Sequence, residues 1–160
     1  MVTMTDTETP PPDGESVAEE EEDTNKKGSQ NEREAANIVG RVRGKGNVEK
    51  VNGYGNTDPW HCADVIAVGE GKVQILQVKT NSFTAADRRK YRREMRRMDF
   101  DHVKFEVWVR VDYKGWRMYR YNPETEEFEQ YLEMDTCNHE ATVEAYREHV
   151  GYYEDQEVNA

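Results

Sequence analysis

Two short apolar segments joined by a tight turn constrain the fold of this chain most strongly. ADVIAV and VQILQVK lie on either side of the turn residues GEGK, so residues 63 to 79 predict a β-hairpin. The segment FTAADRRKYRREMRRM follows with helical propensity, and the five apolar residues that alternate in VKFEVWVRV then predict a strand over residues 103 to 111. Strands on both sides of a helix predict a small α/β domain.

The flanking segments add further elements to this domain. Before the hairpin, apolar residues at helical spacing predict a helix over about 31 to 42, and residues 47 to 51 form a short strand candidate. After residue 111, WRMYRY and FEQYLEM predict two more strands, and HEATVEAYREHV predicts an amphipathic acidic helix. Residues after Val150 are expected to be frayed.

The distribution of charge divides the 160 residues into three parts. Residues 1 to 30 carry nine acids and two bases, residues 31 to 121 carry twelve acids and nineteen bases, and residues 122 to 160 carry twelve acids and one base. The net charge of −11 therefore conceals a basic middle, which keeps nucleic-acid binding open. These patterns predict a disordered acidic tail over 1–28, a core over 29–122 and an acidic C-terminal extension with a helix over 123–160.

Composition also bears on where the protein acts. The chain has no apolar run long enough to span a bilayer, and its start lacks a secretory signal, so we expect a cytoplasmic protein with no membrane partner. Cys62 and Cys137 lack the spacing of a zinc site and are interpreted as ordinary thiols. The surplus of carboxylates and the presence of only two leucines favour a halophilic, archaeal type of source, although acidic flanks alone could produce these numbers.

Three polar residues gather at one end of the predicted hairpin. Gln77 and Lys79 are two residues apart and so share a face of the second strand, while Asp64 begins the first strand. A carboxylate and an amide oxygen suit a hard divalent cation such as Mg²⁺, and a neighbouring ammonium could orient an attacking water. Each residue alone is more often an exposed polar or turn residue, so the interpretation depends on the combination.

This combination resembles the PD-(D/E)XK nuclease superfamily, and within it the archaeal Holliday-junction resolvases. The resemblance covers residues 29 to 121 and is carried by ERE in the first helix, Asp64, the turn, QVK at the end of the next strand and the helix that follows. It implies an α/β fold with a restriction-endonuclease-like core, in which a central mixed β-sheet is flanked by helices in the order αβββαβ.

The same resemblance assigns roles to four residues. Glu32 matches the catalytic acid of the helix, Asp64 the metal-binding aspartate and Lys79 the motif lysine, while Gln77 stands where a second acid usually stands. It implies that Glu32, Asp64 and Gln77 hold Mg²⁺, with Mn²⁺ as an alternative. Gln77 supplies one oxygen but no charge, so metal affinity should fall unless Glu32 or Asp58 compensates. Ala63 replaces a family proline that is not a ligand.

Two further segments are candidates for contact with DNA. The loop NGYGNTDPWHC carries Tyr54 and Trp60, which could stack on a base or sugar, although Trp60 could equally anchor the packing. His61 is a candidate proton carrier, though a surface histidine is the commoner role. The helix after the hairpin carries adjacent arginine pairs at intervals of four residues, and these predict phosphate contacts: Arg88, Arg89, Arg92, Arg93, Arg96 and Arg97.

Two classes of function remain open from the sequence. The first is a Mg²⁺-dependent endonuclease that hydrolyses phosphodiester bonds of duplex or branched DNA, such as a Holliday junction. The second is a non-catalytic nucleic-acid-binding protein that retains the nuclease fold, which Gln77 favours. RNA cleavage is not excluded. The resemblance also implies a homodimer, with the strand at 103–111 or the helix at 138–150 as the contact.

Overall fold

A six-stranded mixed sheet forms the centre of the protein. The computed structural model describes residues 11–51, 63–69, 71–97 and 102–159. The strands follow one another across the sheet in chain order, as β1 (Val48–Lys50), β2 (Val65–Gly69), β3 (Lys72–Thr80), β4 (Val103–Val111), β5 (Gly115–Asn122) and β6 (Glu127–Glu133). The pair β3 and β4 is parallel, and the other four neighbouring pairs are antiparallel.

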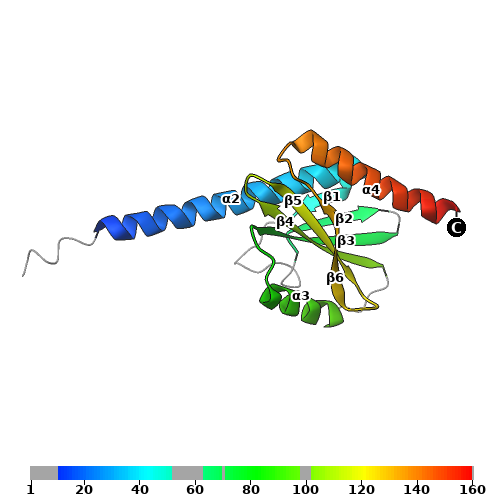
Figure 1. Ribbon diagram of the computed structural model, residues 1–160, viewed down its shortest axis with the longest axis horizontal. Coiled ribbons are helices and arrows are strands. Elements are labelled where there is room, and N and C mark those ends of the chain that lie inside the picture. Colours follow the sequence, from blue (N-terminus) through cyan, green and yellow to red (C-terminus); the bar gives the residue numbers. More distant parts are fainter. Residues whose placement is uncertain (1–10, 52–62, 70, 98–101, 160) are drawn as a thin grey trace, which may run out of the picture.

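Within the described ranges, three α-helices cover the two faces of this sheet. The helices α2 (Pro11–Arg43) and α4 (His139–Asn159) lie on one side, whereas α3 (Ala85–Arg97) lies on the other, as Figure 1 shows. A short 3₁₀ helix, η1 (Lys45–Asn47), connects α2 to β1. Because β3 and β4 are parallel, the chain must cross over between them, and α3 makes that crossing. No helix in the described ranges has the length and apolar character needed to cross a membrane.

Each face of the sheet has its own apolar core. The core under α2 and α4 has large aromatic and aliphatic members, including Ile38, Leu76, Trp108, Trp116 and Tyr146. The core under α3 includes Ile75, Tyr91, Phe105, Val107 and Phe128. Alternate residues of β3 and β4 enter opposite cores, as the pleat of a strand requires. The position of a side chain along β3 therefore determines the face on which it acts.

The structure confirms the fold class predicted from the sequence. The order α2, β1, β2, β3, α3, β4 is the αβββαβ arrangement, and the central sheet is mixed and flanked by helices. The predicted hairpin at 63–79 is formed by β2 and β3, and the strand predicted over 103–111 has those same bounds in β4. The alternation of β-branched and aromatic residues made these strands the most predictable elements.

The two ends of the chain differ from the sequence prediction. The first helix begins at Pro11 instead of near residue 31, so residues 11–28 are helical where the sequence predicted disorder. Similarly, α4 continues to Asn159, beyond the predicted fraying point. Adding residues to an existing helix avoids the cost of nucleation, and proline is tolerated in a first turn. A packed helix can therefore extend through polar sequence that has no core of its own.

The C-terminal segment is an integral part of the fold. The strand β6 pairs with β5 along its length, and α4 places Val143, Tyr146 and Val150 in the core beneath α2 and α4. The acidic extension expected over 123–160 therefore supplies both an edge strand and a covering helix. Without α4, the aromatic side chains of Trp108 and Trp116 would lose part of their cover.

Candidate active site

Asp64 is fixed at the junction of three strands. Its backbone N–H donates to the carbonyl of Leu76 on β3 at 2.9 Å, and its carbonyl accepts from the N–H of Val51 at 2.8 Å. The residue directly precedes β2 and is 5% exposed. The hairpin pairing of β2 and β3 therefore determines where this carboxylate lies.

The Asp64 side chain points back across the hairpin to β3. Its Oδ2 accepts hydrogen bonds from the backbone N–H of Val78 at 2.8 Å and from Nε2 of Gln77 at 2.6 Å. The sequence prediction that Asp64 and Gln77 converge at one end of the hairpin is thus met by a direct contact. These two bonds restrict the rotation of both side chains, so their remaining oxygens have defined positions.

Gln77 carries an unusual buried oxygen. The residue is 8% exposed, and its Oε1 is buried with no hydrogen-bond partner among the described residues. A buried acceptor without a partner costs free energy, so its retention requires an explanation such as a cation or water. An amide oxygen beside a carboxylate is the type of donor set that Mg²⁺ prefers. Both oxygens are therefore donors of the kind that a divalent metal ion accepts, whereas no group of three or more His, Cys, Asp or Glu side chains among the described residues is placed to hold one.

Lys79 lies on the same face of β3, and the start of α3 holds its ammonium group. Lys79 Nζ is 3.4 Å from Oδ2 of Asp87. Partial burial raises the pKa of the Asp87 carboxyl. The hydrogen bond from the backbone N–H of Thr84 and the positive charge of Lys79 lower it by more, so the pKa of Asp87 lies below its ordinary value. Thr84 and Asp87 cap each other at the start of α3. Asp87 was not among the site residues predicted from the sequence, although the spacing of Thr84 and Asp87 in TAAD is a capping signature.

Glu32 approaches the same end of the sheet from α2. Its carboxylate is 3.7 Å from Nζ of Lys50, which also donates to Ser29 Oγ at 2.9 Å. Lys50 is paired in register with Val65, the residue after Asp64. One helical position before Glu32, Asn31 donates to Thr80 Oγ1 at 2.9 Å. These contacts hold α2 against the ends of β1 and β3.

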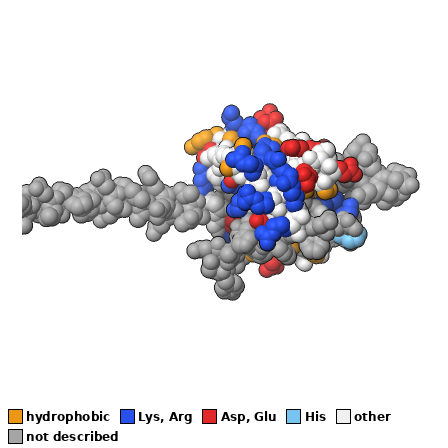
Figure 2. All heavy atoms as spheres, turned by 90° about the horizontal axis from the view of Figure 1, so that it is seen from below, with side chains coloured by type: hydrophobic (Ala, Val, Ile, Leu, Met, Phe, Trp, Pro, Cys, Tyr) orange, Lys and Arg blue, Asp and Glu red, His pale blue; other side chains and the backbone are white. Residues whose placement is uncertain are grey.

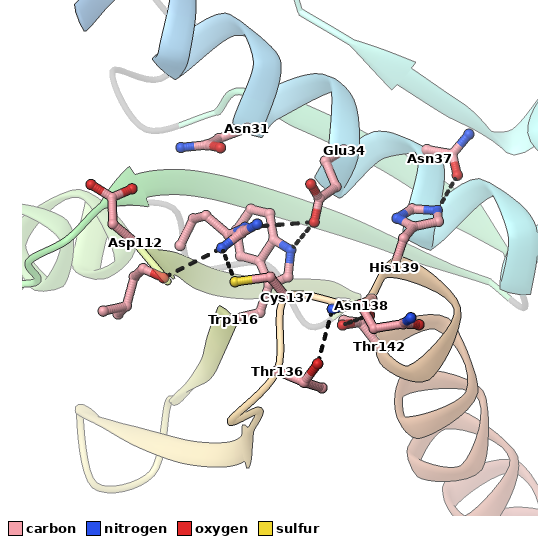
Figure 3. Close-up of polar contacts among 12 residues, drawn as sticks. Asn31, Glu34, Asn37, Asp112, Trp116, Thr136, Cys137, Asn138, His139 and Thr142 are labelled. Carbon is pink, nitrogen blue, oxygen red and sulfur yellow. Dashed lines mark hydrogen bonds and ion pairs between the residues drawn. The ribbon is translucent and has the colours of Figure 1, made fainter. Parts of the chain in front are cut away.

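Glu34, the other acid of the ERE segment, has a structural role. Its Oε1 accepts from the indole N–H of the buried Trp116 at 2.6 Å, and Figure 3 shows these two side chains pointing toward one another. The same oxygen lies 3.6 Å from Nε of Arg110. The two acids therefore have different roles. Glu32 pairs with Lys50 at the end of β1, whose register partner Val65 follows Asp64, whereas Glu34 joins α2 to β4 and β5.

Replacing these two acids separates the two roles. Glu34→Ala is expected to lower the free energy of unfolding by about 1–3 kcal/mol, because it leaves the buried Trp116 N–H without its acceptor. Glu32→Ala removes a partly exposed ion pair with Lys50, so its cost should stay below about 1 kcal/mol. Urea unfolding followed by circular dichroism measures both values. Equal losses of stability would contradict this division.

The helix α3 presents a cationic surface on the side of the sheet that carries Lys79. Tyr91 and Met95 are buried against the sheet, and Figure 2 shows Lys and Arg side chains gathered across this side of the molecule. The α3 surface is defined here by its cationic residues, Arg88, Arg89, Lys90, Arg92, Arg93, Arg96 and Arg97.

Not all arginines of the α3 surface are equally available to a ligand. Arg88 lies over the rings of Phe83 and Tyr119, and Arg96 makes two hydrogen bonds to Glu126, at 3.0 and 2.9 Å. Arg89 and Arg93 are exposed, and neither forms an ion pair within the described ranges. The sequence predicts phosphate contacts from all six arginines, and in the structure Arg89 and Arg93 are exposed and without an ion pair in the described ranges.

Several predicted residues lie outside the described part of the chain. The loop from Asn52 to Cys62 contains Tyr54, Asp58, Trp60 and His61, and their roles remain predictions. Cys137 lies within the described part, where it is an exposed free thiol, as the sequence suggested.

Comparison with solved structures finds Hjc, a Holliday junction resolvase from the archaeal hyperthermophile Archaeoglobus fulgidus. The likeness has a TM-score of 0.42 and 17% sequence identity, and it covers 58% of this chain and 76% of that chain. No protein-family model and no curated protein matches the sequence. The fold class follows instead from the strand order and pairing of the chain itself.

Proposed function

We propose that this protein is a Mg²⁺-dependent endonuclease that hydrolyses phosphodiester bonds in DNA. The observation that carries the proposal is the contact between the Asp64 carboxylate and the Gln77 amide, whose Oε1 is buried without a partner among the described residues. Lys79 lies on the same face, two residues further along β3. A fixed carboxylate and an unsatisfied amide oxygen can hold a divalent cation, and an ammonium can stabilise negative charge on a phosphate, as metal-assisted phosphodiester hydrolysis uses them.

The metal would be held by Asp64 and Gln77, with Glu32 as the third ligand from α2. Mg²⁺ is usually bound through one or two carboxylates together with substrate phosphates, so a set with a single amide is sufficient, and Mn²⁺ accepts the same oxygens. When bound, the ion would polarise the scissile phosphate and lower the pKa of a water. The protein contributes the rigid placement of these oxygens through the hairpin.

Lys79 is assigned the orientation of the nucleophile and the stabilisation of negative charge that develops on the phosphate. Its ammonium donates hydrogen bonds and carries a full positive charge, which stabilises the transition state more than the ground state. Asp87 holds this ammonium at the start of α3. Substrate phosphate can compete with Asp87 for the same donors, so Lys79 can turn from one to the other.

The α3 surface supports DNA as the substrate. Arginine forks match phosphate oxygens, and α3 begins beside Lys79, so a DNA backbone on α3 would pass the candidate site. Branched DNA such as a four-way junction is included in the proposal, and two symmetric cuts in a junction would require a homodimer. The alternative is a non-catalytic nucleic-acid-binding protein, which the loss of one negative charge at Gln77 favours.

The test is incubation of the purified protein with labelled linear, nicked and four-way-junction DNA. We expect cleavage with Mg²⁺ or Mn²⁺ and none with EDTA, with a matched single-stranded RNA as the substrate control. If the protein binds DNA but cleaves it with neither Mg²⁺ nor Mn²⁺, the endonuclease proposal is contradicted and the non-catalytic alternative is supported. Cleavage that persists in EDTA would contradict the metal site.

Gln77→Glu restores the charge that this site lacks. The variant should bind Mg²⁺ or Mn²⁺ more tightly, because a second carboxylate adds Coulomb attraction to the site, and cleavage should be retained or increased. Titration of the metal in a cleavage assay gives the half-saturating concentration for both proteins. A large loss of cleavage by a folded Gln77→Glu variant would show that the amide N–H bond to Asp64 is required instead.

A further inference from the structure

A second candidate site lies on the opposite face of the sheet. A cavity of about 480 Å³ opens at the end of the sheet where β3 and β4 begin, and it is lined in part by Gln74, Glu106, Tyr131, Tyr146 and His149. None of the four candidate catalytic residues contributes to its wall. Cavities of this volume are typical of sites for small organic molecules.

A buried carboxylate with every oxygen satisfied forms the floor of this cavity. Glu106 is 7% exposed; its Oε2 accepts from Gln74 Nε2 at 2.6 Å, and its Oε1 accepts from Trp108 Nε1 at 3.0 Å and from the Tyr131 hydroxyl. The network continues from Gln74 to the Tyr146 hydroxyl. Because its oxygens are already occupied, Glu106 organises the floor and is not the group that would bind a ligand.

The rim of the cavity is cationic. Among the described residues that line it, four carry a positive charge, namely Arg43, Lys72, Lys104 and Arg120, whereas the acids are Glu106 and Glu129. The pKa of His149 falls to about 4, first because of burial and then because of the charges of Arg120 and Lys104. The imidazole is therefore neutral at neutral pH.

Flat rings make up part of the wall. The Tyr131 and His149 rings stack with centroids 4.2 Å apart and planes at 16°, and the Arg120 guanidinium lies 5.9 Å from the Tyr131 ring. Stacked aromatic rings beside cations suit a ligand that combines a planar ring with a phosphate. Neither a purely apolar molecule nor a bare cation would be complementary to such a wall and rim.

We infer that this cavity binds a 5′-phosphorylated nucleoside, with the phosphate toward Lys104 and Arg120 and the base against the wall formed by Tyr131 and His149. The ligand is either a free nucleotide or the phosphorylated end of a DNA strand, since both present the same chemistry. This site goes beyond the proposed nuclease centre, and its occupancy does not depend on metal or on cleavage.

Isothermal titration of the full chain with AMP tests the inference, with adenosine and inorganic phosphate as partial ligands. We expect AMP to bind, and adenosine and phosphate each to bind at least about tenfold more weakly. The double variant Lys104→Gln and Arg120→Gln should weaken AMP binding at least about tenfold. The matched control is Arg117→Gln, which removes a positive charge from the other face of β5 and should change the affinity less than twofold.

A thermal melt of each variant confirms that the fold is retained. Absence of AMP binding at millimolar concentration, or equal weakening by the control, would overturn the inference. Phosphate that binds as tightly as AMP would also overturn it, because the ring would then contribute nothing. Displacement of AMP by a 5′-phosphorylated oligonucleotide, but not by its 5′-hydroxyl form, assigns the site to a strand end, and failure of both to displace AMP assigns it to a free nucleotide.

Discussion

Asp64→Asn and Lys79→Ala are each expected to lower the rate of DNA cleavage by at least about a hundredfold, while DNA affinity remains within about threefold of the parent protein. Asparagine keeps an oxygen that can accept from the Val78 N–H, so the hairpin should be preserved, but it removes the charge that a metal ligand needs. Lys79 lies at the end of β3 with its ammonium 3.4 Å from Asp87, and it can be truncated without opening the core.

Single-turnover cleavage of a labelled four-way junction measures the rate, and gel-shift titration measures affinity in parallel. The control is Asp135→Asn, which removes a carboxylate charge from an exposed position outside the site. Lys79→Arg adds a further distinction, because it keeps the positive charge but changes the donor geometry. Parallel loss of DNA binding and cleavage would indicate that Asp64 and Lys79 have a structural role. The proposed catalytic roles of these two residues would then be contradicted.

The local part of this site could be predicted because it depends on one hairpin. The turn GEGK sets the register of β2 on β3, and that register brings Asp64 to the same end as Gln77 and Lys79. The period of two along a strand then places Gln77 and Lys79 on one face. Such arguments use only neighbouring residues, so they do not require knowledge of the tertiary structure.

The part that could not be predicted depends on contacts between distant segments. Glu106 alternates with apolar residues in β4 and would be expected to face solvent, but α4 and β6 bury it among Gln74, Trp108 and Tyr131. The reach of α2 to Pro11 likewise depends on a helix that is already nucleated by packing. The periodicity of one segment does not show which other segments cover a face of the sheet, and it does not show how far a packed helix extends.

The sequence also could not show which arginines of α3 are engaged by other segments, and this difference predicts a large effect on DNA affinity. Arg89→Gln together with Arg93→Gln is expected to lower affinity for duplex DNA by about 10- to 100-fold at low salt, since these two exposed residues have no ion pair within the described part of the chain. Each lost phosphate contact should also reduce the slope of log affinity against log salt by about 0.9. The double variant should therefore lower the slope by about 2.

Arg96→Gln provides the matched control, because its guanidinium is already engaged by the two oxygens of Glu126 and should contribute less to a DNA backbone. Binding titrations of the parent, the double variant and the control at four salt concentrations give both the affinity and the slope. If Arg96→Gln reduces affinity as much as the double variant, then the pair with Glu126 opens on binding and all six arginines act together. If neither variant changes the slope, DNA does not lie on α3, and the path of the substrate past Lys79 must come from another surface.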